Sequence, residues 1–182
     1  MTTRSKFIIV EHNATKARLH WDLRFIMPKS KLWMSFAIRK GVPTDAGKKV
    51  LAVRTHDHTK EEALFLGRIP EGEYGAGILK KWDDGDCIIH KFSPGHILIE
   101  FKGKKIKGFY HLVSTGVINR KEYKSQQYIL FKGKTLNEWS GMISRVPDLW
   151  GDEVEEVEDT DYSKKLPWSK VHSTVGKKNK GG

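Results

Sequence analysis

The chain has 182 residues, of which 38% are hydrophobic and 30% charged, a composition that fits one globular domain with or without a tail. The single cysteine, Cys87, excludes a disulfide framework, and no apolar run reaches the ~20 residues of a membrane helix or forms a signal-peptide core, so we expect a cytoplasmic protein. The net charge is +11, and residues 1–145 hold 27 Lys and Arg against 14 Asp and Glu, which favours nucleic acid as the partner, although a merely solvated basic surface has the same composition.

Short alternating runs, separated by Gly, Pro, Asn or Asp, recur along the chain and predict β-strands. The expected strands are residues 6–11, 19–25, 32–38, 50–54, 78–82, 87–92, 97–101, 108–114 and 128–131. Residues 83–86 and 102–105 have the composition of hairpin turns, the first centred on Asp84-Gly85. Only residues 59–65 and 136–144 resemble short helices. Many short strands joined by tight turns predict a mainly β protein, an antiparallel barrel or sandwich.

The most informative strand is residues 19–25, Leu-His-Trp-Asp-Leu-Arg-Phe. Alternate side chains of a strand point to opposite faces, so His20, Asp22 and Arg24 share one face and four apolar residues share the other. Three unrelated polar residues on a solvated sheet would give the same pattern.

His12 strengthens the case for a functional face, because it ends the preceding predicted strand and residues 13–18 form a returning loop. Pairing of the two strands would bring His12 across from His20 and Asp22. Two imidazoles and a carboxylate with open positions form a site for Mn, Fe or Zn. Arg24 beside such a metal could hold a phosphate oxygen.

The other motifs are weaker. His56 and His58 share one side of a predicted strand, but a surface pair is the commoner reason for an isolated His-x-His; His58 also precedes the predicted helix over residues 59–65. The Gly-rich stretch over residues 67–77 lacks both the Lys-Ser/Thr ending of a P-loop and the helix of a dinucleotide-binding fingerprint, so we interpret it as a loop that leads into a strand. No Gly-x-Ser-x-Gly elbow occurs, and nucleophilic Ser or Cys catalysis is not expected.

The predicted body ends near Arg145. Beyond it the chain is broken by Pro147 and Gly151, becomes acidic, and closes on Gly and Lys residues. Blocks of like charge favour a flexible tail, although its aromatic residues could dock part of it on the body. We therefore divide the chain into a domain over residues 1–145 and a tail over residues 146–182.

Ordered blocks of sequence between residues 6 and 132 resemble a known family. They are residues 7–12, 18–24, 35–41, 51–53, 57–58, 65–67, 69–77, 82–85, 101–108 and 128–132. In this order they resemble the 3′-phosphoesterase domain of bacterial DNA ligase D and its stand-alone bacterial and archaeal relatives.

The resemblance implies a compact antiparallel β-barrel around a polar active-site cavity and a Mn²⁺-dependent enzyme that trims DNA 3′ ends. A phosphodiesterase step removes a 3′-terminal ribonucleoside, and a phosphomonoesterase step removes the 3′-phosphate. The implied partners are DNA primer–template 3′ ends and a separately encoded ligase or polymerase. On matching positions, the implied metal ligands are His12, His20 and Asp22, and the implied phosphate contacts are Arg24, His58 and Lys40, with His58 also as a general acid.

This chain departs from the family at several positions. The loop between His12 and His20 is two residues longer than expected, Glu62 stands where the family has Tyr, and Val50 where it has Arg, so that Lys48 or Lys49 would have to substitute. An ionised Glu cannot donate a hydrogen bond to a phosphate oxygen, so we expect a weakened phosphomonoesterase step.

Two alternatives remain open from the residues alone. A nucleic-acid-binding barrel without catalysis explains the basic body, and it predicts that no metal binds. A metal-dependent phosphoesterase that acts on a small phosphate or on RNA explains the His and Asp residues, and it predicts activity on free nucleotides.

Overall fold

The computed structural model describes residues 2–119 and 124–133. Its elements are β1 (Thr3–Ala14), β2 (Arg18–Ile26), β3 (Trp33–Ile38), β4 (Lys49–His58), α1 (Lys60–Ala63), β5 (Gly67–Ile69), β6 (Gly77–Ser93), β7 (His96–Lys102), β8 (Lys107–Asn119) and β9 (Lys124–Lys132). The predicted helix over residues 136–144, the end of the body and the tail lie outside the described residues. None of the helices within the described ranges combines the length and the apolar character that crossing a bilayer requires.

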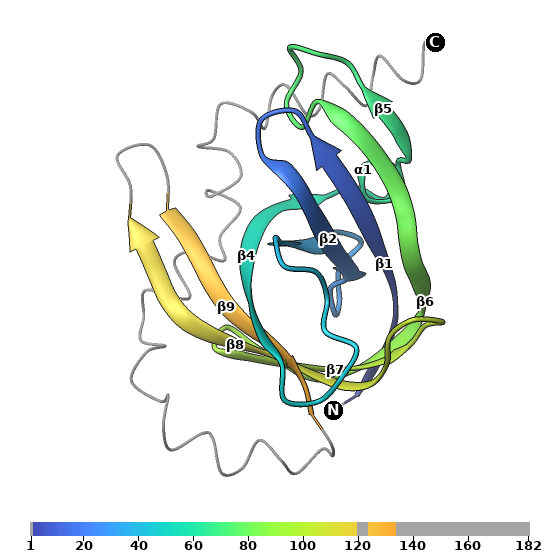
Figure 1. The fold of residues 1–182 in the computed structure, drawn as a ribbon. Helices are drawn as coiled ribbons and strands as arrows, with labels where there is room; N and C mark the ends of the chain where they lie inside the picture. The colour runs from blue at the N-terminus through green and yellow to red at the C-terminus, as the bar shows by residue number, and fades with distance from the viewer. Residues whose placement is uncertain (1, 120–123, 134–182) are drawn as a thin grey trace.

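The strands form one antiparallel sheet that closes on itself (Figure 1). Neighbours follow the order β1-β2-β3-β4-β9-β8-β7-β6, and β1 pairs with β6 to close the barrel. The short β5 pairs with β6 outside this ring. The antiparallel β-barrel expected from the sequence is therefore confirmed, with one four-residue helix in the described part of the chain.

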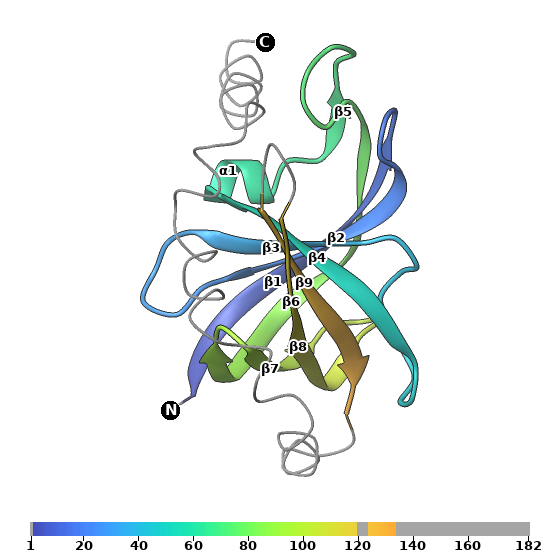
Figure 2. The same cartoon turned by 90° about the vertical axis from the view of Figure 1, so that its left-hand side faces the viewer.

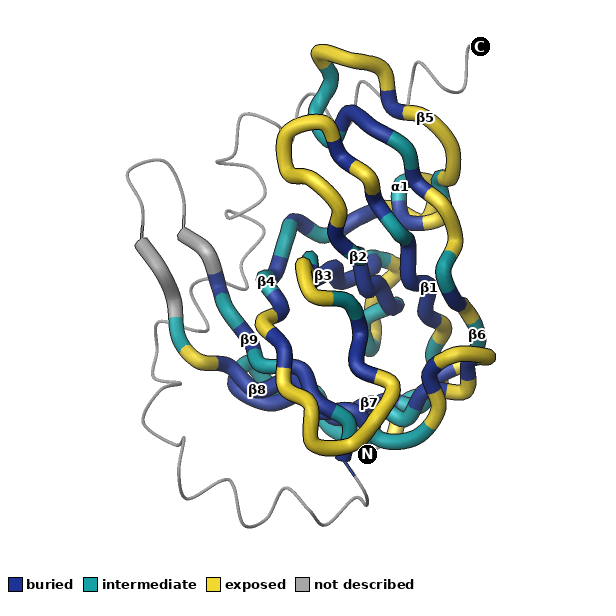
Figure 3. The backbone as a smooth tube through the Cα atoms, in the orientation of Figure 1, coloured by how far each residue is buried: buried dark blue, intermediate teal, exposed yellow. Residues whose placement is uncertain are grey.

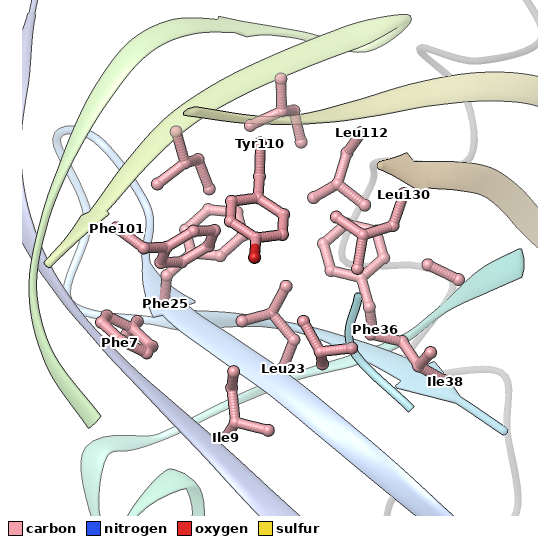
Figure 4. Close-up of a cluster of buried hydrophobic side chains, with 14 of the residues drawn as sticks. Phe7, Ile9, Leu23, Phe25, Phe36, Ile38, Phe101, Tyr110, Leu112 and Leu130 are labelled. Atoms are coloured by element: carbon pink, nitrogen blue, oxygen red, sulfur yellow. The ribbon is translucent and has the colours of Figure 1, made fainter. Parts of the chain in front are cut away.

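The interior of the barrel is apolar. Every strand of the ring contributes alternate side chains to one buried cluster, and Figure 4 shows many of them pointing toward each other. Its largest fully buried members are Tyr110, Tyr128, Phe7, Phe25, Phe36 and Phe101. The polar cavity that the resemblance implied inside the barrel is therefore wrong, because apolar side chains fill the interior. A polar site has to lie on the other face of the sheet, which we call the outer face.

A smaller apolar cluster covers part of the outer face. Its buried members are Ile8, Val10, Trp33, Ala63, Ile69 and Leu79, from β1, β3, α1, β5 and β6. Figure 2 shows α1 and β5 at the end of the barrel away from the start of β1, and Figure 3 colours most of β3 and the middle of β1 as buried residues. Together α1, β5 and residues 70–76 form a cap, and we use that name for them below.

The turn predicted over residues 83–86 is wrong. β6 runs without a break from Gly77 to Ser93 and pairs with β1 through this stretch, Ile8 opposite Asp84 and Phe7 opposite Gly85. Two long-range features explain the difference. The Asp83 carboxylate accepts backbone N–H bonds from the turn at residues 104–106, at 2.9–3.0 Å. Gly85 has φ +155°, and a Cβ there would lie 2.7 Å from the carbonyl oxygen of Lys102, so the glycine permits close strand contact rather than a turn.

Candidate metal centre

One hairpin holds the first group of polar side chains. β1 and β2 pair with His12 opposite His20 and Val10 opposite Asp22, which is the pairing that the alternating pattern predicts. The core side chains Ile9 and Leu23 point into the barrel, so the polar residues point to the outer face. The two histidines and the aspartate are nonetheless buried, because the cap covers them. We call these three residues the first cluster.

The first cluster is arranged around its carboxylate. Nδ1 of His12 lies 3.4 Å from Oδ2 of Asp22, and Nε2 of His20 lies 3.2 Å from Oδ1. The two imidazole rings are 4.7 Å apart between centroids and tilted by 55°. The donor atoms of a tetrahedral site with metal–ligand bonds of about 2.0–2.2 Å are separated by roughly 3.3–3.6 Å. The two His–Asp separations are therefore close to those between ligands of one metal ion, and the three donor atoms lie within 4.8 Å of one another.

In each ring of the first cluster, the nitrogen that points away from Asp22, which we call the outer nitrogen, is bound to a backbone carbonyl. Nε2 of His12 lies 2.8 Å from the oxygen of Gly75, and Nδ1 of His20 lies 3.0 Å from that of Arg18. A carbonyl only accepts, so both outer nitrogens must carry the proton. The inner nitrogens then face the carboxylate, and a proton or a metal ion has to lie between them. Metal-binding histidines in proteins are held in this way, so the residues fit a divalent metal.

The pKa values of Asp22 and His20 are both shifted in the direction that favours the charged form. Burial by itself would raise the pKa of Asp22, but hydrogen bonds from His12 and His20 and the charge of Arg24 outweigh it and hold this pKa well below its usual range. Burial likewise opposes protonation of His20, yet its hydrogen bond and charge interaction with Asp22 leave the His20 pKa raised. Asp22 is thus ionised, and the site holds positive charge next to it.

Arg24 connects the first cluster to the cap. Its Nη2 donates to Oδ2 of Asp22 at 3.2 Å, and its Nη1 donates to the carbonyl oxygen of Ala63 at 2.9 Å, with that of Glu62 at 3.4 Å. Its Nε is buried, with no hydrogen-bond partner among the described residues. The structure therefore gives Arg24 a positioning contact with both Asp22 and α1, which sequence reasoning did not foresee.

A second group lies where β4 meets α1. His56, His58 and Glu62 each offer a ligand atom, and these atoms lie within 4.8 Å of one another. Both histidines are buried and Glu62 is half-buried. We call these three residues the second cluster. The sequence interpretation of His56 and His58 as a surface pair is wrong, because both side chains are buried.

Glu62 was missed as a companion of the two histidines. Its place follows from α1, which starts at the N-cap Thr59: Oγ1 of Thr59 accepts from the Glu62 N–H, and the Glu62 carboxylate accepts from the Thr59 N–H. The spacing Thr-x-x-Glu is the signature of a capping box, and it could have located this carboxylate.

The remaining sequence candidates are not members of these two clusters. Lys40 is exposed in the turn that follows β3. Val50 is a core residue, so no arginine-like contact can come from its position. The ammonium group of Lys49 lies 5.4 Å from the ring centroid of Phe131.

A third pair of buried histidines stands on β7 and β8. Nε2 of His96 lies 3.0 Å from Nδ1 of His111, and the rings stack with centroids 5.2 Å apart. No carboxylate in the described part of the chain joins this pair to form a group of three ligands. Burial, with smaller contributions from Lys91 and His111, lowers the pKa of His96 to about 3. In the described part of the chain this pair therefore lacks the carboxylate that the first cluster has.

Comparison with known proteins gives one consistent result. Residues 10–114 match the family described as the DNA Ligase D 3′-phosphoesterase domain. The chain is 40% identical over 121 residues to the multifunctional non-homologous end joining protein LigD of Mycolicibacterium smegmatis, an alignment that covers 60% of this chain and 15% of that protein. It is 34% identical over 134 residues to LigD of Pseudomonas aeruginosa, covering 71% of this chain and 15% of that protein. The chain thus spans about one seventh of the length of these relatives.

Proposed function

The chain belongs to the family of DNA ligase D 3′-phosphoesterase domains, and from this membership we propose that it is a metal-dependent phosphoesterase that trims DNA 3′ ends during non-homologous end joining. Its proposed substrate is a primer–template end that carries a 3′-terminal ribonucleotide. It removes the ribonucleoside as a phosphodiesterase and the remaining 3′-phosphate as a phosphomonoesterase. The proposed partners are this DNA and a ligase or polymerase that seals or extends the trimmed end.

One observation carries the proposal: a ring nitrogen of His12 and one of His20 lie 3.4 and 3.2 Å from the two carboxylate oxygens of Asp22, and the other nitrogen of each ring is bound to a backbone carbonyl. A mixed imidazole and carboxylate set with open positions suits Mn²⁺ as well as Fe²⁺ or Zn²⁺. A divalent metal held there would polarise a phosphoryl oxygen. The three residues supply the ligands, and Arg24 keeps Asp22 in place and ionised.

The contacts to phosphate are proposed on the family resemblance together with burial and charge. Arg24 and His58 are buried basic side chains, and Lys40 is exposed in the turn after β3. The positive charge of residues 1–145 supports binding of a DNA backbone. His58 is the proposed general acid for the leaving oxygen.

Glu62 is proposed to make the second step the slower one. Its carboxylate belongs to the group formed with His56 and His58, so it lies close to the proposed phosphate contact. A terminal phosphate carries about −1.5 to −2 near neutral pH against −1 for a diester, so the carboxylate repels the monoester more strongly. After screening, the difference is about 1–2 kcal/mol, or about tenfold in rate. Products should therefore accumulate with 3′-phosphate ends.

The proposal is tested with the full chain and a labelled primer that has a single 3′-terminal ribonucleotide. We expect shortening of the primer with Mn²⁺, none with a chelator, and none for Asp22→Asn. Asp86→Asn is the matched control, because Asp86 is an exposed aspartate that pairs with Lys6 at 3.1 Å on a neighbouring part of the sheet. Equal shortening by wild type and Asp22→Asn would refute the assignment, and primer binding without any shortening would favour a non-catalytic nucleic-acid-binding barrel.

A further inference from the structure

We propose that the second cluster, His56, His58 and Glu62, binds a second divalent metal ion next to the one proposed for the first cluster. The three donor atoms lie within 4.8 Å of one another beneath the cap. Two imidazoles and one glutamate are a ligand set that proteins use for zinc with an open fourth position. The donor set and its burial thus point to a transition metal rather than to Mg²⁺ or Ca²⁺, which prefer oxygen ligands.

The rings of the second cluster are arranged like those of the first. The centroids of His56 and His58 are 4.3 Å apart and the rings are tilted by 55°, against 4.7 Å and 55° for His12 and His20. Donor atoms around zinc are separated by roughly 3.3–3.6 Å, so a cluster within 4.8 Å needs only a small rotation of side chains to close on an ion.

The carboxylate of the second cluster is already held in place. The N–H of Thr59 donates to Oε1 of Glu62 at 3.0 Å, and the Glu62 N–H donates to Oγ1 of Thr59 at 3.3 Å. A carboxylate has two oxygens with several lone pairs, so a carboxylate that accepts this hydrogen bond in the capping box can also bind a metal. A ligating carboxylate that is itself hydrogen-bonded is the usual arrangement around protein metals.

The two clusters share the same cap. Arg24 donates to Asp22 of the first cluster and to the carbonyls of Glu62 and Ala63. Residues 70–76 link them again, since the oxygen of Gly75 binds His12 and the neighbouring Tyr74 ring packs edge-on against His56, with centroids 6.0 Å apart. The two clusters are therefore linked through Arg24 and through residues 74 and 75.

The spacing of the donor atoms sets the expected order of binding. In the first cluster the ring nitrogens of His12 and His20 already lie 3.4 and 3.2 Å from carboxylate oxygens of Asp22, whereas the donor atoms of the second cluster lie within 4.8 Å of one another. The side chains of the second cluster have to rotate before they close on an ion, so we expect this cluster to bind more weakly. Resting on the proposed function, this gives the second ion a role: it neutralises Glu62, so removal of the 3′-phosphate would require the higher metal concentration. While this ion is bound, His58 is one of its ligands, so the general-acid role proposed for His58 belongs to the protein with only the first ion bound.

The experiment counts metal ions bound to the metal-free full chain by equilibrium dialysis against Zn²⁺ with elemental analysis. We expect two Zn²⁺ per wild-type chain, bound in two steps. Glu62→Gln and His56→Phe should each bind one and keep the tighter step. The glutamine retains the hydrogen-bonding oxygen of the capping box while it removes the charge, so α1 stays intact; far-ultraviolet circular dichroism checks the fold.

His90→Gln is the control, because His90 pairs with Glu100 at 3.1 Å and lacks a third ligand among the described residues; it should bind two ions. The numbers of bound ions distinguish a failure of this proposal from a failure of the proposed function. One ion in wild type that is lost in Asp22→Asn but kept in Glu62→Gln overturns the second site alone. One ion that is kept in Asp22→Asn but lost in Glu62→Gln refutes the first site and supports the second. Two ions in both Glu62→Gln and His56→Phe also overturn the proposal.

Discussion

Two pairs of buried histidines face each other across neighbouring strands of this barrel, and they behave in opposite ways. His12 and His20 lie beside Asp22 on β1 and β2, and the pKa of His20 is raised despite burial. His96 and His111 stack on β7 and β8 without a third ligand in the described chain, and burial lowers the pKa of His96 to about 3. Burial is common to both, so the carboxylate is what turns a packed pair into a site that attracts a cation.

The largest effect is expected when the carboxylate beside His12 and His20 is neutralised, because this pair then resembles His96 and His111. Asp22→Asn keeps the shape of the side chain and removes its charge. We expect catalytic turnover to fall by more than about a hundredfold, since even loss of a residue that only supports a ligand costs about 10–100-fold. Initial rates on the 3′-ribonucleotide primer measure the effect. Rates within threefold of wild type would show that the carboxylate is not what distinguishes the two pairs.

The pair His96 and His111 should make the free energy of unfolding fall at acid pH. The folded-state pKa of His96 is about 3 against 6.5 for an exposed histidine, so the unfolded chain binds the proton first and stability falls as the pH drops below about 6.5. At pH 4.5, two units below, this amounts to about 3 kcal/mol. His96→Leu should therefore lose less stability than wild type between pH 7.5 and 4.5 in urea titrations. An unchanged difference between the two pH values would contradict the lowered pKa.

Added metal should sharpen the contrast, because an ion that binds only the folded protein stabilises it. With free Zn²⁺ at about one hundred times its dissociation constant, one site contributes about 2.7 kcal/mol. We expect the metal to raise the unfolding free energy of wild type and of His111→Phe by similar amounts. Asp22→Asn should gain less than either. If His111→Phe were not stabilised by the metal, the metal would bind at His96 and His111 and not at the first cluster.

The smallest effect concerns the first pair without metal. The His20 pKa is raised above 6.5 by Asp22, so the corresponding stability is fully present below pH 6.5 and is lost as the pH rises through the folded-state value. With a chelator present, wild type should melt at a lower temperature at pH 9 than at pH 6. His20→Gln should show a smaller difference between the two pH values, and an equal or larger one would argue against the pairing with Asp22.

The hairpin of the first cluster could be predicted from the sequence because β1 and β2 are neighbours in the chain. Alternation assigned His20 and Asp22 to one face, and a short loop after His12 fixed the partner strand. The turn predicted over residues 83–86 failed because an Asp-Asp-Gly run is equally suited to accept amides from a distant turn, here through Asp83. The second cluster was underestimated because Glu62 joins it through the capping box, which the strand pattern of His56 and His58 does not include.

The placement of the polar site outside the barrel also could not be predicted. Strand alternation separates two faces but does not say which of them is enclosed. The choice depends on all strands together: the aromatic residues of β1, β2, β3, β7, β8 and β9 need the larger volume, and they fill the interior. The polar face is then the outer one, where the cap contacts His12, Arg24 and His56.

The first cluster lies entirely on one hairpin, and this has a consequence for how the protein folds. Its ligands are joined by the turn between β1 and β2, whereas closing the barrel requires β1 to pair with β6, with Thr3 opposite Ile89. Hairpins form in about 1–10 μs, while non-local β topologies take milliseconds to seconds. We expect a Zn²⁺ indicator to report uptake before tryptophan fluorescence reports barrel closure during refolding from urea; simultaneous signals would contradict this. Metal-binding capacity would then precede the native state, and the ion would assist the nascent chain before any substrate could reach it.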